Sequence, residues 1–565
     1  MLDQRARSRA GLLTGVALAL LLLAPVLGPG YVLVRDMVFV PRLPFGGQLL
    51  GRNGVPRGVP SELVVALASR VVAAGWLQDA LLLGLVIGGA WGAARLAPTT
   101  SRTGAVVAAA TYGWSPYLHE RLLLGQWALL VGWAVLPWAV RASLAWRAGH
   151  TGWWAICWLV VASLAGANAL LLVGLAVVVC GRPGRALAAT AVLALPWAVP
   201  GALQEMAAGD RAGVAAFAAN SDTPFGVLGS LLTGGGVWSS TAIPAGRSAG
   251  SALAVVVLVL ALAGLGRVTS QFGLRLLLLS GTGLVLALLG RLPLAGDALR
   301  WAVVHVPASG LLRDGQKWVA PVVLITAVSA AAGVDLLLDQ LAPGRRRALV
   351  TVMLAVLPVA ALPNAAWGEG GRLHSSHYPA AWERVTRQAQ GAVLVLPWTL
   401  YRAFPWTGEQ VVLDPAVKLL QRPVVNDALP LADRTVAGED LLAVELDAAA
   451  RAGTPLLPAL RASGISQVLV ERTTQGFDPV LVASQVRGLT VVADSSELTL
   501  LAVPGGGRSA SRAAWGPVVL ADLLAVAFAS LAMVLAWRRR DRRCRPGSSP
   551  SSTISAPVEE RSEGE

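Results

Sequence analysis

Long runs of apolar residues alternate with short polar loops along most of the chain. The first run, residues 11–29, can cross a bilayer as a helix, because a helix rises about 1.5 Å per residue and the hydrocarbon core is about 30 Å thick. Similar runs recur as far as residue 363, and one more follows at residues 515–536. The pattern predicts a polytopic α-helical membrane protein with about twelve transmembrane helices.

A more polar stretch separates the last apolar run from the others. Within it, short β-branched runs alternate with helical patterns, which predicts a small α/β domain. These segments lie at residues 392–396, 438–452, 455–462, 467–470 and 489–493. We therefore expect a transmembrane domain at residues 1–365, an extracytoplasmic α/β domain at 366–512, a final transmembrane helix at 513–537, and a basic, then disordered, tail at 538–565.

The charges indicate which side of the membrane each loop occupies. The net charge is +14, and arginines gather in short loops and at both ends of the chain. Cytoplasmic loops of membrane proteins carry such an excess of positive charge. Both termini are therefore expected in the cytoplasm and the α/β domain outside the cytoplasmic (inner) membrane. Only 14% of the residues are charged, which excludes an ordinary soluble protein. The lipid bilayer is an expected partner, and nucleic acid is not, because no basic stripe interleaves with aromatics.

Motifs for metals, disulfides and nucleotides are weak or missing in the sequence. The three cysteines, Cys157, Cys180 and Cys544, lie outside the α/β domain, so no disulfide framework is expected there. No phosphate-binding or dinucleotide-binding glycine loop occurs. His374 and His377 could share a helix face as metal ligands, but no ligand follows at zinc-like spacing, which favours ordinary surface histidines.

Three charged clusters fall where the chain re-emerges on the predicted outer side. They are Arg35-Asp36, His119-Glu120-Arg121, and the segment from His305 through Arg313-Asp314 to Lys317. Ionisable groups near membrane spans cost free energy at bilayer depth, so those that occur there tend to face an internal cavity. We expect the clusters to roof one outward-facing cavity. The alternative is ordinary interfacial loops with snorkelling cations.

Two of these clusters have residue types that suit group transfer. Asp36, beside the cation Arg35, suits a general base that acts on a substrate hydroxyl at the membrane surface. Arg313 and Lys317, four residues apart at the start of a span, suit the phosphate of a lipid carrier, because a helix N-terminus also attracts anions. A hydrated loop at Asp36 and a structural interface at the second pair remain the alternatives.

Residues 30–41 (GYVLVRDMVFVP) and 119–127 (HERLLLGQW) resemble membrane proteins of the GT-C glycosyltransferase superfamily. The resemblance is to the membrane part of the actinobacterial α-(1→3)-arabinofuranosyltransferases. It implies a many-spanning bundle, a catalytic acidic residue in the first outer loop, a polyprenyl-phosphate sugar donor, and often an extracytoplasmic C-terminal domain.

The resemblance also implies roles for individual residues. Asp36 would be the catalytic base, Arg313 and Lys317 would hold the donor phosphate, and Glu120 or Arg121 would orient a substrate. The supporting residues are Arg35, His119, Glu120, Arg121, His305 and Asp314. The chain departs from the family in its smaller size and in the single carboxylate of its first loop before Glu62, where many members have a pair. That departure puts a metal site in doubt: no cofactor is certain, and a divalent metal is left as an open alternative.

Together these observations predict an enzyme that moves an arabinofuranose- or mannose-type sugar from a polyprenyl-phosphate donor to a cell-envelope glycan or glycolipid. The alternative is a non-enzymatic transporter or flippase for lipid-linked sugars, or a scaffold in wall synthesis. A transporter would favour polar residues within spans and a repeat relating two halves, and neither is evident in the sequence. A scaffold with an inactive Asp36 would have the same sequence pattern.

Overall fold

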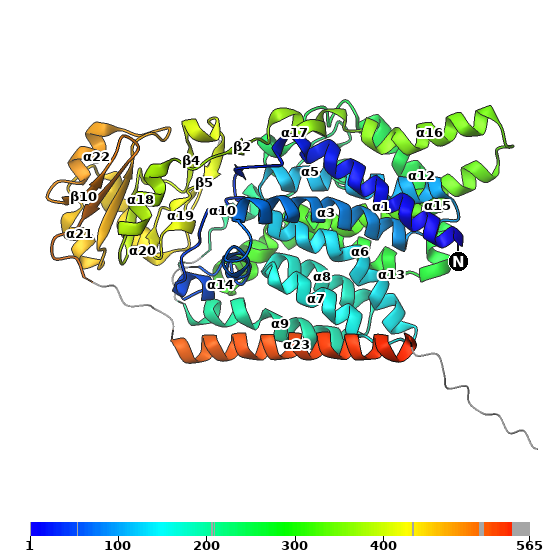
Figure 1. Ribbon diagram of the computed structural model, residues 1–565, viewed down its shortest axis with the longest axis horizontal. Helices are drawn as coiled ribbons and strands as arrows, with labels where there is room; N and C mark the ends of the chain where they lie inside the picture. The colour runs from blue at the N-terminus through cyan, green and yellow to red at the C-terminus, as the bar shows by residue number, and fades with distance from the viewer. Residues whose placement is uncertain are drawn as a thin grey trace, which may run out of the picture.

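The computed structural model describes residues 2–52, 55–204, 207, 209–431, 434–507 and 514–544. The chain is mostly helical, and most of its long helices run side by side in one bundle (Figure 1). The strands of the C-terminal region form a separate layer at one end of this bundle, which we call the domain end (Figure 1). The predicted tail beyond residue 544 and the predicted boundary at residues 512–513 lie outside the described residues.

Seven helices of the described chain are long and apolar enough to cross a membrane. They are α1 (Leu2–Leu23), α3 (Ala74–Leu96), α6 (Trp127–Arg147), α9 (Pro183–Leu203), α12 (Ser251–Phe272), α15 (Ala320–Asp339) and α23 (Trp515–Cys544). The count rises to nine if two bent helix pairs are each one span, α13 (Arg275–Leu288) with α14 (Pro293–His305) and α16 (Arg345–Ala360) with residues 363–371. The prediction of a mostly helical chain with several helices able to span a membrane is confirmed.

The remaining predicted spans are shorter than a straight crossing requires. They fold as α4 (Arg102–Gly113), α7 (Trp153–Leu164) and α8 (Ala167–Cys180), with 12, 12 and 14 residues. A helix needs about 20 apolar residues to cross the hydrocarbon core. The expected number of about twelve spans therefore stays a prediction.

Glycines allow the central helix α15 to pack tightly against α12. A Cβ atom on Gly333 would lie 1.9 Å from the carbonyl oxygen of Leu260, and one on Gly264 would lie 2.0 Å from that of Ser329. Small residues let helix backbones approach closely where there is no hydrophobic drive between helices. α15 is also the most deeply buried of the seven long helices, so it forms the centre of the bundle.

In the described part of the C-terminal region, five strands form a mixed sheet in the order β10-β11-β9-β3-β6. The elements that match predicted segments are β3 (Val393–Leu396), β9 (Gln467–Glu471), β10 (Thr490–Asp494), α20 (Leu441–Arg451) and α21 (Leu457–Ala462). Sequence analysis missed β6 (Pro423–Val424) and β11 (Leu498–Ala502). β3 pairs in parallel with β6 and β9, and every residue of β3 and β9 is buried, as in sheets covered on both faces.

Backbone hydrogen bonds join the first loop of the bundle to this C-terminal region. The loop strand β1 (Tyr31–Val32) pairs with β2 (Ser375–Ser376), in antiparallel register. Three residues further on, the Arg35 N–H donates to the Val411 carbonyl and the Arg35 carbonyl accepts from the Leu413 N–H. Both partners lie on β5 (Val411–Leu413), which forms a hairpin with β4 (Tyr401–Ala403). The first loop is thereby held against the sheet region.

We expect Gly333→Val to destabilise the protein, because the new side chain must push α15 away from the Leu260 carbonyl. Overpacking of this kind costs about 1–3 kcal/mol. The thermal unfolding midpoint in detergent measures the effect. The control is Gly266→Val on α12, where a Cβ atom meets nothing within 4 Å. Equal midpoints for the two variants would contradict the tight packing described above.

Candidate functional site

A short buried helix at the domain end carries three consecutive ionisable residues. Helix α5 (Pro116–Leu123) is capped by Ser115, whose side chain accepts a hydrogen bond from the Leu118 N–H. Its residues His119, Glu120 and Arg121 are completely buried. Successive residues of a helix project about 100° apart, so the three side chains extend in different directions. Each of them meets a different segment of the chain.

Arg121 joins α5 to the segment that precedes α15. Its Nη1 and Nη2 atoms lie 2.5 and 2.9 Å from the two carboxylate oxygens of Asp314, and its Nε donates to Gln316 Oε1 at 2.6 Å. Burial acts to raise the pKa of Asp314, but the Arg121 charge and hydrogen bonds hold it below its usual value. Bidentate pairing of this kind fixes both position and orientation.

Glu120 joins α5 to the loop between α9 and α12. It accepts a hydrogen bond from Gln316 Nε2 at 2.8 Å and shares another with Asp222. Asp222 in turn accepts from Arg247 Nε at 3.2 Å and from the Gly236 N–H at 2.9 Å.

Two adjacent buried carboxylates repel each other, so the arrangement requires one proton between them. Burial and the neighbouring Asp222 raise the pKa of Glu120 well above its usual value. Burial also acts to raise the pKa of Asp222, but hydrogen bonding from Glu120 and the Arg247 charge hold it below its usual value. The two opposite shifts favour Glu120 as the protonated partner of the pair.

His119 joins α5 to the segment that leads into the C-terminal region. Its Nδ1 atom contacts the Glu369 carboxylate, and its ring packs edge-on against Trp114. Glu369 lies in a turn of four residues, 367–370, that all have positive φ, between 56° and 67°. That conformation costs about 1–3 kcal/mol for each residue that is not glycine, and it is usually found where surrounding contacts impose it. The buried His119 contact is such a constraint.

Asp36 lies where the first loop, α5 and the β4–β5 hairpin meet. Its N–H donates to the Leu124 carbonyl at 3.3 Å, and its carboxylate accepts from the Tyr401 hydroxyl at 2.5 Å. Gly125 (φ 73°) allows this contact, because a Cβ atom there would lie 2.2 Å from the Val34 carbonyl oxygen. Burial raises the pKa of Asp36, while the Tyr401 hydrogen bond and nearby Lys418, Arg35 and Arg57 act to lower it.

Cations surround Asp36, and most of them have carboxylate partners. Lys418 pairs with Glu62, and Arg57 lies 3.1 Å from Asp427 and 3.4 Å from Glu439. Arg35 instead donates to the Thr241 hydroxyl at 2.5 Å, and within the described chain it makes no ion pair with a carboxylate. A divalent cation is bound by oxygen ligands that include carboxylates, and the three cations around Asp36 would repel it, so this set of neighbours does not fit one. Among the described residues, no group of three or more His, Cys, Asp or Glu side chains is arranged so that it could hold a metal ion.

The other predicted site residues are held in different places. Arg313 pairs with Glu439 at 3.0 Å, while the Lys317 ammonium donates to Asn168 at 2.8 Å and to the Leu311 carbonyl. The two cations are thus held by different partners, whereas the sequence predicted that they would act on one phosphate. His305 is exposed, stacks on Trp301 and is not joined to the other clusters in the described structure.

Glu439 is a bridge that sequence analysis missed. Its two carboxylate oxygens accept separately from Arg57 in the first loop and Arg313 before α15. Other contributors that the sequence analysis did not name as site residues are Tyr401, Asp222, Arg247, Gln316 and Glu369. Asp222 is a charged residue in a long loop between apolar runs, which is a weak signal in the sequence, but nothing in the sequence marks Tyr401. His374 and His377 were expected to be ordinary surface histidines instead of a metal pair. In the structure His374 Nε2 hydrogen-bonds to the Thr407 carbonyl and His377 is exposed.

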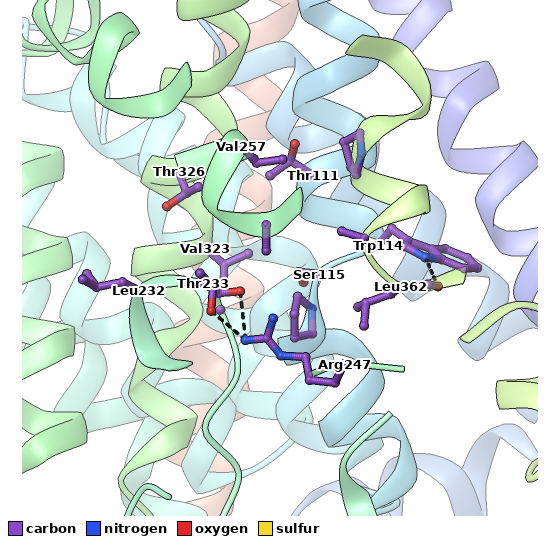
Figure 2. Close-up of a pocket in the computed structure, with 15 residues that line it drawn as sticks. Thr111, Trp114, Ser115, Leu232, Thr233, Arg247, Val257, Val323, Thr326 and Leu362 are labelled. Carbon is purple, nitrogen blue, oxygen red and sulfur yellow. Dashed lines mark hydrogen bonds between the residues drawn. The ribbon is translucent and has the colours of Figure 1, made fainter. Parts of the chain in front are cut away.

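A cavity of about 50 Å³ lies beside the Glu120–Asp222–Arg247 group, between α4, α12 and α15. Figure 2 shows the Arg247 guanidinium at its edge, hydrogen-bonded to Thr233 at 2.7 Å, with Thr111 and Val257 across the space. Most of the lining is apolar. Asp36 is not among the residues that line this cavity.

No protein-family model matches the chain, and no curated protein or solved structure has a significant match to it.

We expect Glu120→Gln to keep the stability of the protein and to remove part of its sensitivity to alkali. The amide can donate to Asp222 without a titrating proton. In the wild type, the raised pKa of Glu120 gives a stabilisation that is complete below the unfolded pKa of about 4.3 and lost as pH rises through the folded pKa. The thermal unfolding midpoint as a function of pH tests this expectation.

Glu120→Ala is the matched comparison, because it removes the hydrogen bonds that Asp222 and Gln316 make with Glu120 at every pH. A Gln variant as unstable as the Ala variant at neutral pH would show that the pair does not share a proton.

Proposed function

We propose that this protein is a membrane glycosyltransferase of the GT-C type, which moves a sugar from a polyprenyl-phosphate donor to a cell-envelope glycan or glycolipid. The observation that carries the proposal is the surroundings of Asp36. A carboxylate of raised pKa lies at the domain end of a membrane bundle, aligned by Tyr401 and surrounded by cations. A base and positive charge side by side are what sugar transfer from a phosphate donor needs.

In the proposed reaction, Asp36 takes the proton from a hydroxyl of the acceptor. The oxygen of that hydroxyl bonds to the anomeric carbon of the donor sugar. The bond between the anomeric carbon and the phosphate oxygen breaks, and the lipid phosphate leaves with the electron pair. Negative charge thus grows on the leaving phosphate, where a fixed cation stabilises it most.

Arg35 is the better candidate for the phosphate contact. It is adjacent to Asp36 in the chain and has a hydroxyl partner instead of a carboxylate within the described structure. Its φ of 43° is strained for a residue that is not glycine. The β5 backbone holds this conformation through hydrogen bonds to both the N–H and the carbonyl of Arg35. Arg313 and Lys317, the sequence-based candidates, would support the site through Glu439 and the segment before α15.

The proposal places the chemistry on the extracytoplasmic face of the cytoplasmic membrane, with both termini in the cytoplasm and about twelve spans. The arginine-rich start of α1 and end of α23 lie at the end of the bundle opposite the domain end (Figure 1), which supports that orientation. A sugar of arabinofuranose or mannose type follows from the resemblance of residues 30–41 and 119–127. Bound donor without turnover would instead favour a transporter or scaffold.

We expect Asp36→Asn to lower the transfer rate by about 10²–10⁴-fold, because a neutral amide cannot accept the proton. Transfer is measured with protein in lipid nanodiscs, from synthetic polyprenyl-phosphate arabinofuranose and mannose to oligosaccharide acceptors. Asp297→Asn is the control, since Asp297 is exposed at the same end and pairs only with Arg300 among the described residues. Full activity in the Asp36 variant would exclude Asp36 as the base.

We expect Tyr401→Phe to move the acidic limb of the rate against pH to higher pH. The hydrogen bond from Tyr401 favours the ionised form of Asp36, so its loss raises the pKa of Asp36 further. Activity then requires a higher pH before the base is ionised. Rates across the acidic range in buffers of constant ionic strength show the shift. A uniform loss of rate at all pH values would instead indicate a purely structural role for Tyr401.

A further inference from the structure

A second cavity, of about 290 Å³, opens at the domain end beside the first loop. Its walls come from both parts of the protein, with Tyr31 and Trp76 from the bundle side and His377 and Tyr378 from the segment after β2. The start of α3 approaches the loop closely at Gly75, where a Cβ atom would lie 2.6 Å from the Gly30 carbonyl oxygen. The cavity therefore lies where the first loop, the start of α3 and the segment after β2 meet.

The larger side chains around this cavity are aromatic. Among the described residues, no Asp, Glu, Lys or Arg lines it, so its chemistry is unsuited to a phosphate or another anion. The Tyr31 and Tyr378 rings contact each other edge to face, with centroids 5.4 Å apart, and Trp76 is 57% exposed. Tyr31 and His377 add polar groups at the rim. Flat aromatic faces with a few hydrogen-bonding groups suit a neutral ligand that has both C–H faces and hydroxyls.

We propose that this cavity binds a neutral saccharide unit of the acceptor, at a distance from the reacting hydroxyl. The inference rests on the proposed function. Tyr31 and Asp36 are five residues apart, so their Cα atoms are separated by at most about 18 Å, which a few sugar units can span. An acceptor chain held here would bring its reacting end to Asp36, and its remote binding energy would help to position that end.

A tryptophan at the start of a membrane helix can also serve as an anchor at the bilayer interface. Two observations favour a ligand site over an anchor. The opposite wall comes from His377 and Tyr378, which belong to the C-terminal region and not to the bundle. The Tyr378 hydroxyl donates to the Phe39 carbonyl at 2.9 Å, which holds its ring in place before any ligand binds. A pre-organised wall loses less conformational entropy on binding.

The test measures saccharide binding without turnover. Full-length protein with Asp36→Asn, in lipid nanodiscs, is titrated by calorimetry with neutral arabinofuranose and mannose oligosaccharides of two to six units. Adding Trp76→Ala is expected to weaken binding by about tenfold or more. Adding Tyr31→Phe keeps the ring and removes the hydroxyl, so a smaller loss is expected. The matched control is Trp301→Ala, whose side chain is also 57% exposed but packs on His305 and does not line the cavity.

Absence of binding for every oligosaccharide overturns the proposal, and so does an unchanged affinity in the Trp76 variant. An equal loss in the Trp76 and Trp301 variants also overturns it, because that result indicates a general effect on membrane insertion. Failure of the saccharide site can be distinguished from failure of the proposed transferase function. If the wild type transfers no sugar but Trp76→Ala alone weakens saccharide binding, transfer fails and the binding site stands. If transfer proceeds with the same KM for long acceptors in Trp76→Ala, the site fails and transfer stands.

Discussion

Burial of three adjacent ionisable side chains on α5 is the constraint on which the domain end depends. A charged or polar group without a partner in a buried setting costs several kcal/mol, so His119, Glu120 and Arg121 each need a specific partner. Those partners come from three separate segments: Glu369 before the sheet region, Asp222 in the long loop, and Asp314 before α15. One short helix thereby holds in place three segments that have little regular secondary structure of their own around these residues.

The same helix also sets the position of Asp36. The Asp36 N–H donates to the Leu124 carbonyl just after α5, and Gly125 leaves room for the first loop to lie against that turn. From the other side, β5 pairs with the Arg35 backbone and Tyr401 holds the Asp36 carboxylate. The candidate base is therefore held between the bundle and the sheet region, and neither part alone forms its surroundings.

A buried ion pair group in the sheet region supports the residue that contacts Asp36. Arg402, next to Tyr401 in β4, lies 2.6 Å from Asp414 and 2.8 Å from Glu471 at the end of β9. All three side chains are fully buried, so removing one partner would leave an uncompensated charge. The group ties the hairpin to the central strand of the sheet. The position of Tyr401 thus depends on the domain core and not only on the contact with the bundle.

Several features followed from the sequence because they depend on local composition. Bilayer crossing depends on runs of apolar residues, so the multi-pass class was predicted, and β-branched runs located β3, β9 and β10. The polar cluster at residues 119–121 was recognised because ionisable groups beside a span are costly. Span number was less certain, since α4, α7 and α8 are short helices that hydropathy alone does not separate from full crossings.

Only the tertiary structure decided which charged groups meet. Asp36 and Tyr401 are 365 residues apart, and Arg57 and Glu439 are 382 apart, so no local pattern could pair them. The spacing of Arg313 and Lys317 in the sequence predicted that they act together. In the structure Arg313 pairs with Glu439, whereas Lys317 donates to Asn168. Periodicity determines which residues share a face of one element. The choice of partner depends on how elements distant in the chain pack, and that is a property of the whole fold.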